Sequence, residues 1–175
     1  SAQSLRSVGV AMTAMGGAIT AISVLAVKGA LEEEIGLKRL DAALRRVGES
    51  YGGNRQAIES VVATLERKTN YSDSEQRGAL EKLISLTGDY SASLGMLPVV
   101  LDVAAGLQMD LQTASLLVAK AMEGNTEALS RYGIKLAEGA GPTEIMAALM
   151  ERFGGSAAAA ANPLTVLRNQ VSNLM

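Results

Sequence analysis

Apolar residues recur at spacings of three and four along most of the chain, which is the pattern of helices with one buried face. The clearest stretch covers residues 94–136, where three short helices are predicted in close succession. A glycine stop followed by a polar cap marks each boundary between them. The predicted stops and caps are Gly106 then Asp110, Gly124 then Asn125 or Thr126, and a last stop at Gly133.

Apolar positions near both ends alternate by three and four as in a heptad repeat, and we call each such set a seam. The N-terminal seam comprises Leu5, Val8, Met12, Met15, Ile19 and Ile22. The middle seam comprises Leu37, Leu40, Leu44 and Val47, and the C-terminal seam comprises Leu164, Leu167, Val171 and Leu174. A continuous helix over residues 4–50 would span about 70 Å at about 1.5 Å per residue.

The seams have two interpretations. In the first, they pair with other copies of the chain, in which case heptads without a strong Ile or Leu bias do not separate a trimer from a hexamer. In the second, they are the buried faces of amphipathic helices that fold back on their own chain. Asn169 and Gln170 lie off the C-terminal seam, so we expect both side chains to be solvated.

Several shorter signals divide the rest of the chain. Residues 48–54 are predicted to form a loop that is broken at Gly52 and Gly53 and followed by a helix capped at Asn54. Residues 72–75 read as a capping box. Pro142 suits a first helical position, and the helix after it has an apolar face. That face comprises Ile145, Met146, Leu149, Met150 and Phe153, and Pro163 then predicts a kink or restart.

Together these patterns predict an all-α fold without a sheet. We expect a long helical rod over residues 1–53, a cluster of short helices over 54–153, and a C-terminal helix over 154–175 that continues beyond the sequence. The chain begins without Met inside one helical pattern and ends inside another, so we expect it to be a segment of a longer protein.

Composition supports helices and removes several classes of function. Apolar residues make up 48% of the chain but aromatic residues only 3%, so the core is built from small and aliphatic side chains. The net charge of −2 and the lack of a basic run argue against nucleic-acid binding. The sequence has no His and no Cys, which leaves only carboxylates as metal ligands. With no catalytic constellation visible, we predict neither an enzyme nor a cofactor.

Residues 7–27 contain no charged side chain and are long enough to cross a bilayer. Many of them are Ala, Gly, Ser or Thr, so the average hydrophobicity is modest for a stable membrane span. The alternative function that we consider is therefore a membrane-active helical protein, a pore former or channel, in which this segment inserts.

Six short strings occur in a defined order along the chain: residues 8–16 (VGVAMTAMG), 101–106 (LDVAAG), 110–111 (DL), 120–124 (KAMEG), 129–134 (LSRYGI) and 153–157 (FGGSA). In this order they resemble the tail tape measure proteins of long-tailed bacteriophages. Tyr132 stands where Leu is commoner in that family, and Pro98 lies in a segment that is usually free of Pro.

The resemblance implies a structural, multi-copy helical protein inside the phage tail, made in the host cytoplasm and kept in the virion. In that family the length of the chain sets the length of the tail during assembly, and the protein takes part in genome ejection. The implied partners are further copies of itself, the tail tube protein, tail-tip or baseplate proteins and tail assembly chaperones. Transient membrane contact during ejection is a further expectation, for which residues 7–27 are the candidate segment.

Overall fold

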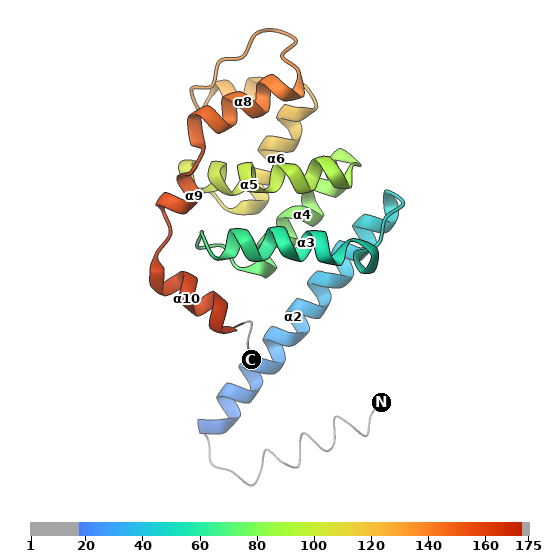
Figure 1. Cartoon of the computed structure of the whole chain (residues 1–175), viewed down its shortest axis with the longest axis vertical. Helices are drawn as coiled ribbons and strands as arrows, with labels where there is room; N and C mark the ends of the chain where they lie inside the picture. Colours follow the sequence, from blue (N-terminus) through green and yellow to red (C-terminus); the bar gives the residue numbers. More distant parts are fainter. Residues whose placement is uncertain (1–17, 173–175) are drawn as a thin grey trace. The chain divides into compact units, whose positions relative to one another are not determined.

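The computed structural model describes the backbone of residues 18–172 and the side chains of residues 27–171. Every regular element in this range is a helix, and no strand occurs within it (Figure 1). The all-α prediction is therefore confirmed. The contacts divide the chain into two units, residues 1–36 and residues 37–175.

Helix α2, Ala18–Arg46, begins in the first unit and ends in the second. Its side chains from residue 27 to residue 35 are exposed, including the apolar Val27, Leu31 and Ile35. The prediction of a helix from residue 4 falls largely outside the described residues. Of the N-terminal seam, Leu5, Val8, Met12 and Met15 lie outside them, whereas Ile19 and Ile22 lie in α2 at positions whose side chains are not described.

The second unit gathers the remaining helices around α5. Helix α5 packs against α4, α6, α8 and α9, and it runs beside α3 (Figure 1). The bounds are α3 Tyr51–Glu66, α4 Asp73–Thr87, α5 Tyr90–Leu107, α6 Leu111–Met122, α7 Glu127–Ser130, α8 Pro142–Phe153, α9 Ser156–Ala159 and α10 Pro163–Ser172.

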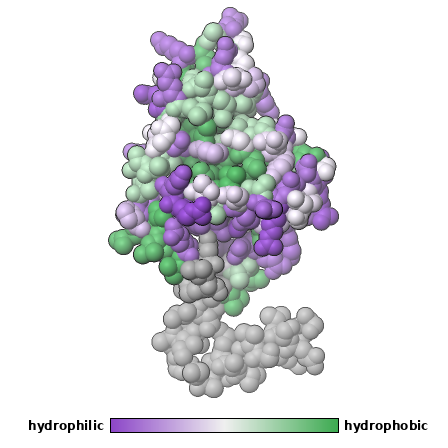
Figure 2. Space-filling model, viewed as in Figure 1, coloured by the Kyte–Doolittle hydropathy of each residue, from purple (hydrophilic) through white to green (hydrophobic). Residues whose placement is uncertain are grey.

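Two hydrophobic clusters hold the second unit together. The larger one surrounds α5 and draws side chains from α4, α6, α7, α8 and α9. The smaller one joins the end of α2 to α3 and α4 through Leu40, Leu44, Ile58, Val62, Leu80 and Ile84. On the face seen in Figure 2, hydrophilic and apolar side chains are interspersed.

Helix α5 has 18 residues with a mean hydropathy of 1.5, so it could cross a membrane by length and composition. Its position explains the apolar composition without a bilayer, since neighbouring helices surround it. Leu97, Val100, Leu101 and Val103 are fully buried there. Pro98 lies inside the helix, as the sequence predicted.

Most of the predicted helix boundaries are confirmed. Ser72 and Glu75 form the capping box that starts α4, with the Glu75 carboxylate accepting the Ser72 N–H at 2.8 Å. Asp110 caps α6 by accepting the Thr113 N–H at 2.9 Å. Helix α8 begins at Pro142, and α10 restarts the helical path at Pro163.

The predicted loop over residues 48–54 is wrong in its second half, because α3 already begins at Tyr51. The cap is Ser50 rather than Asn54: its hydroxyl oxygen accepts the Gly53 N–H at 3.1 Å. The Tyr51 N–H is satisfied by Asp41 Oδ1 of α2 at 2.9 Å. Caps therefore decide this boundary, and the two glycines lie inside the first helical turn.

Gly106 does not end its helix, which continues to Leu107. Gln108 takes the left-handed conformation that glycine usually adopts at a helix end, with a φ of 54°.

Two predictions about exposed and buried side chains are wrong. Met150 of the predicted apolar face is 59% exposed, and Asn169, which was expected to be solvated, is only 8% exposed. Asn169 is buried because its amide donates to the Asn70 carbonyl at 3.1 Å.

Candidate functional site

A junction between α5 and the start of α9 joins residues that are more than fifty positions apart in the sequence. The Asp102 carboxylate accepts the Gly155 N–H at 3.1 Å and the Ala157 N–H at 2.9 Å. Helix α9 has no cap from a side chain of its own cap residue, Gly155. Asp102 therefore satisfies N–H groups that this short helix would otherwise leave unpaired, and its negative charge suits a helix N-terminus.

Gly106 lies one turn further along α5, at the point where α8 ends against it. A Cβ atom at this position would lie 2.6 Å from Phe153 Cδ1 and 3.2 Å from Ser156 Oγ. Phe153 is 5% exposed, so its ring has little room to move. Gly106 is thus required for close packing of α8 on α5, which is a different role from the helix stop that its sequence position predicted.

The junction connects two of the strings that carry the family resemblance, residues 101–106 and 153–157. Their apolar members belong to the larger hydrophobic cluster, as do apolar residues of the strings at 110–111, 120–124 and 129–134. The most conspicuous residues of these strings therefore have roles in packing and capping.

The loop before α4 holds the C-terminal segment through Asn70. The Asn70 side chain donates to the Ala160 carbonyl at 2.8 Å and accepts the Asn162 N–H at 2.7 Å. The backbone carbonyl of Asn70 accepts from the Asn169 amide. Three polar contacts from one residue thus fix the path between α9 and α10.

A group of charged residues joins α3 to α4. Arg77 is 11% exposed and makes a two-pronged contact with Glu59, at 3.0 Å and 2.8 Å, as well as a 2.7 Å ion pair with Asp73. The Tyr51 hydroxyl donates to Glu59 at 2.8 Å. Burial raises the pKa of Glu59, but the hydrogen bonds from Arg77 and Tyr51 outweigh it, so this pKa is lowered. The arrangement is a structural ion network with both acids already engaged.

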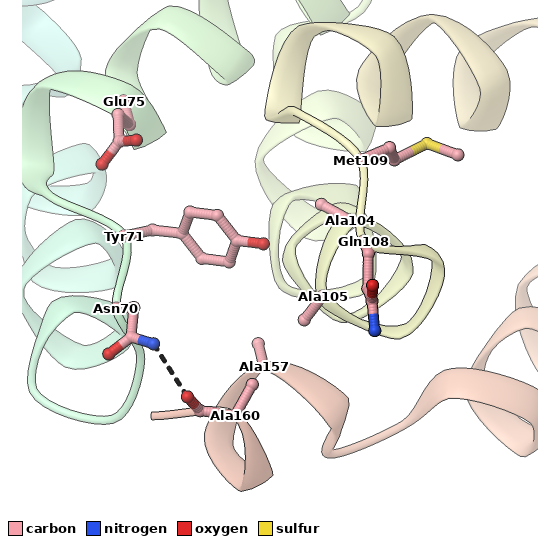
Figure 3. Close-up of a pocket in the computed structure, with 9 residues that line it drawn as sticks. All are labelled: Asn70, Tyr71, Glu75, Ala104, Ala105, Gln108, Met109, Ala157 and Ala160. Atoms are coloured by element: carbon pink, nitrogen blue, oxygen red, sulfur yellow. Dashed lines mark hydrogen bonds between the residues drawn. The ribbon is translucent and has the colours of Figure 1, made fainter. Parts of the chain in front are cut away.

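A pocket of about 280 Å³ opens where the loop before α4, the end of α5 and α9 meet (Figure 3). The Tyr71 ring projects into it toward Ala104 (Figure 3). Burial, and then the charges of Glu75 and Asp102, raise the pKa of the Tyr71 hydroxyl. The lining residues are Asn70, Tyr71, Glu75, Ala104, Ala105, Gln108, Met109, Ala157 and Ala160.

The structure places the predicted seams in different environments. In the middle seam, Leu40 and Leu44 are fully buried against α3 and α4, whereas Leu37 and Val47 are partly exposed. The chain's own core therefore uses the centre of that seam. In the C-terminal seam, Leu164, Leu167 and Val171 are exposed by 76%, 56% and 46%, and Leu174 lies outside the described residues. Self-association through the exposed positions stays a prediction.

Sequence patterns did not reveal the polar groups that organise this region. Asp102 stands in an apolar helix without a local partner, and its partners follow more than fifty residues later. In the sequence, Asn70 and Tyr71 are recognisable only as turn residues. Glutamine is not a residue type that favours the left-handed conformation, so nothing marked Gln108. Such roles depend on tertiary proximity, so no local signal could have identified them.

Among the residues that the structure describes, no group of three acidic side chains lies close enough together to hold a metal ion. Comparisons with protein-family models, with curated proteins and with solved structures find no match to this chain.

Proposed function

We propose that the chain is a helical, non-catalytic segment of a phage tail tape measure protein. The observation that carries this proposal is the ordered resemblance between residues 101 and 157, together with the fact that its strings fold into one cluster around α5. Unrelated Ala-rich and Leu-rich helices would match by chance one at a time. An ordered set of strings that also share one hydrophobic cluster is harder to obtain by such separate chance matches.

The features of α2 suit a protein that measures length. A helix has a fixed rise, so its 29 residues span about 43 Å at about 1.5 Å per residue. Helices gain most of their stability from packing an apolar face, and Val27, Leu31 and Ile35 are about half exposed. In the proposed arrangement this face packs on other copies, as a trimer or hexamer, or on the tail tube protein.

The remaining partners follow from the same proposal. Tail-tip or baseplate proteins and assembly chaperones contact the chain during assembly, and the protein resides in the virion. Its part in genome ejection and any transient membrane contact through residues 7–27 also belong to this proposal. The alternative is a pore-forming protein in which residues 7–27 insert into the bilayer, and the burial of the apolar α5 removes only a second candidate for a membrane span.

The location of the protein in phage particles tests this proposal. We would raise antibodies against residues 37–175 and apply them to phages purified from the bacterium that produces the chain, with intact and disrupted tails compared by immunogold electron microscopy. The proposal predicts labelling of disrupted tails and none of intact tails or heads. Labelling of cell membranes without virions would support the pore-forming alternative and refute the tail proposal.

A further inference from the structure

Helix α10 displays its apolar side chains on the face that points away from the second unit. With 3.6 residues per turn, positions 164, 167, 168 and 171 share one face of the helix. All four are exposed, whereas residue 169 on the opposite face is buried. Apolar side chains gather in Figure 2 at the place that α10 occupies in Figure 1. The exposed face comprises Leu164, Leu167, Arg168 and Val171.

The side of α10 that faces the second unit is held through polar groups. The Asn169 amide donates to the Asn70 carbonyl at 3.1 Å, and the Asn162 N–H just before the helix donates to Asn70 Oδ1 at 2.7 Å. A surface helix usually packs by its apolar face and leaves its polar face in water. Helix α10 has the reverse orientation, so its exposed leucines and valine form a stripe that the second unit does not cover.

A second uncovered stripe lies on the first half of α2. Val27, Leu31 and Ile35 follow one another at intervals of four, and each is about half exposed. Like the α10 stripe, this one places three aliphatic side chains along about two helical turns. Contiguous exposed apolar residues mark surfaces that pack against a partner. The two stripes therefore match in length and in the type of side chain.

The charges beside the two stripes are of opposite sign. Residues 27–36 carry three glutamates against one lysine, and that lysine, Lys28, is paired with Glu32 at 3.7 Å. Arg168 is the one charged residue of α10. Two α2 segments, or two α10 helices, would bring like charges together, whereas α2 against α10 brings opposite charges together. The charge pattern therefore favours a contact between the two different stripes.

The positions of two charged residues select a parallel arrangement of these helices. At about 100° per residue, Glu34 lies about 60° to one side of the α2 stripe, and Arg168 lies about 70° to the opposite side of the α10 stripe. Two parallel helices that face each other bring these opposite sides together. Glu34 then comes beside Arg168, in the way that charged residues flank the apolar seam of a coiled coil. An antiparallel pair would instead place the Lys28 side of α2 beside Arg168.

We propose that the apolar stripe of α2 in one copy of the chain docks in parallel on the apolar stripe of α10 in a second copy, with Glu34 beside Arg168. The proposal rests on the proposed function in one respect, namely that several copies of the chain lie together. Because the two surfaces differ, each copy uses both of them, and the contact repeats into a closed ring or an open chain. The surfaces are small, so we expect a Kd in the micromolar to millimolar range.

Sedimentation velocity of the whole chain and of two variants tests the pairing. Leu31→Glu places a charge in the α2 stripe and Leu167→Glu places one in the α10 stripe, and both positions are exposed, so the fold should persist. We expect the parent chain to associate, and each variant alone to associate about tenfold more weakly. Mixing the two variants should give a complex of one copy of each, because the first contributes an intact α10 and the second an intact α2. The control is Met150→Glu, at a similarly exposed apolar position on α8, which should associate like the parent.

Charge reversal tests the parallel arrangement separately. Glu34→Arg and Arg168→Glu should each weaken association about threefold to fivefold, and combining them in one chain should restore it. Glu33→Arg makes the same change of charge on the side of α2 away from the stripe, so its effect should be smaller. Failure of the double reversal to restore association would overturn the parallel arrangement.

Three results would overturn the pairing itself. One is a parent chain that stays monomeric at millimolar concentration. Another is undiminished association of Leu31→Glu or of Leu167→Glu, which would show that the altered stripe is not part of the contact. The third is the lack of a complex in the mixture of the two variants when the circular dichroism of each matches that of the parent. None of these results bears on the tail proposal, which is tested by the presence of the protein in phage particles.

Discussion

Two glycines of α5 differ in their surroundings and give a matched pair of substitutions. At Gly95, an added Cβ would have nothing within 4 Å beyond the helix itself, whereas at Gly106 it would lie 2.6 Å from the Phe153 ring. Gly95→Ala and Gly106→Ala therefore make the same chemical change on one helix. Only the second change forces a neighbour to move.

The expected magnitudes follow from two opposing terms. Alanine is favoured over glycine inside a helix by about 1 kcal/mol, so Gly95→Ala should stabilise the chain by about 0.5–1 kcal/mol. Gly106→Ala gains less stability from helix propensity than Gly95→Ala, because residue 106 lies near the end of the helix. Overpacking a core costs about 1–3 kcal/mol, and the Phe153 ring is 5% exposed. Gly106→Ala should thus be less stable than Gly95→Ala by about 1–3 kcal/mol.

Urea unfolding followed by circular dichroism at 222 nm measures both differences. A second substitution isolates the cause: Phe153→Leu removes the ring, so adding Gly106→Ala to it should cost much less than in the parent chain. The reasoning is refuted if Gly106→Ala is as stable as Gly95→Ala, or if its cost is the same with and without the ring.

Three further substitutions or conditions test other contacts. Arg77→Met leaves the Glu59 carboxylate without its main partner and should lower the free energy of unfolding in urea by about 2–4 kcal/mol. This cost is below the largest values for buried ion pairs because the Glu59 side chain is 29% exposed. A loss under 1 kcal/mol would show that the network is dispensable. The pKa of Glu59 is lower in the folded chain than its value of about 4.3 in the unfolded chain. Glu59 therefore stabilises the fold at pH values above the unfolded pKa, and this stabilisation is lost as the pH falls through the folded pKa. Melting temperatures should therefore change little from pH 8 to about pH 5 and fall below about pH 4, and Glu59→Gln should reduce that fall, whereas an unchanged pH profile would exclude Glu59 as its source. Asn70→Ala removes two of the three contacts to the C-terminal segment, so amide hydrogen exchange should become faster over residues 160–170 while α6 stays protected. The control is Asn54→Ala, which alters contacts only around the start of α3. Equal exchange over residues 160–170 in both variants would contradict the role assigned to Asn70.

The sequence was most informative where structure is decided locally. Helix periodicity and the lack of aromatic and β-branched clusters predicted the all-α class, and the caps at Ser72 and Asp110 depend on atoms within three residues. The same local logic chose the wrong cap at the start of α3, where Ser50 rather than Asn54 accepts the Gly53 N–H, and it did not foresee that the Tyr51 N–H is satisfied by Asp41 ten residues away on the preceding helix. The contact with Asp41 is tertiary, so a short window of sequence does not contain it.

The candidate site could not be predicted for the same physical reason. Its pocket is made from a loop, a helix end and a short helix that are brought together by packing around α5. The residue types involved, such as alanine and glutamine, are common on ordinary helices. Gly106 shows the limit most clearly, since the residue that predicted a helix end is instead required by a ring 47 positions later in the chain, at Phe153.

The central claim, that the chain measures length within a phage tail, is tested most directly by the length of the tail itself. We would insert a helix-forming segment of about 28 residues, four heptads, after Lys28 in α2 and measure the tails of the resulting phages by electron microscopy. At about 1.5 Å per residue the account predicts tails longer by about 42 Å. The same segment inserted after Gly139, in the exposed loop before α8, should leave tail length unchanged, because there it would extend a surface loop. Normal tail length after the insertion in α2, with the protein present in the particles, would contradict the claim.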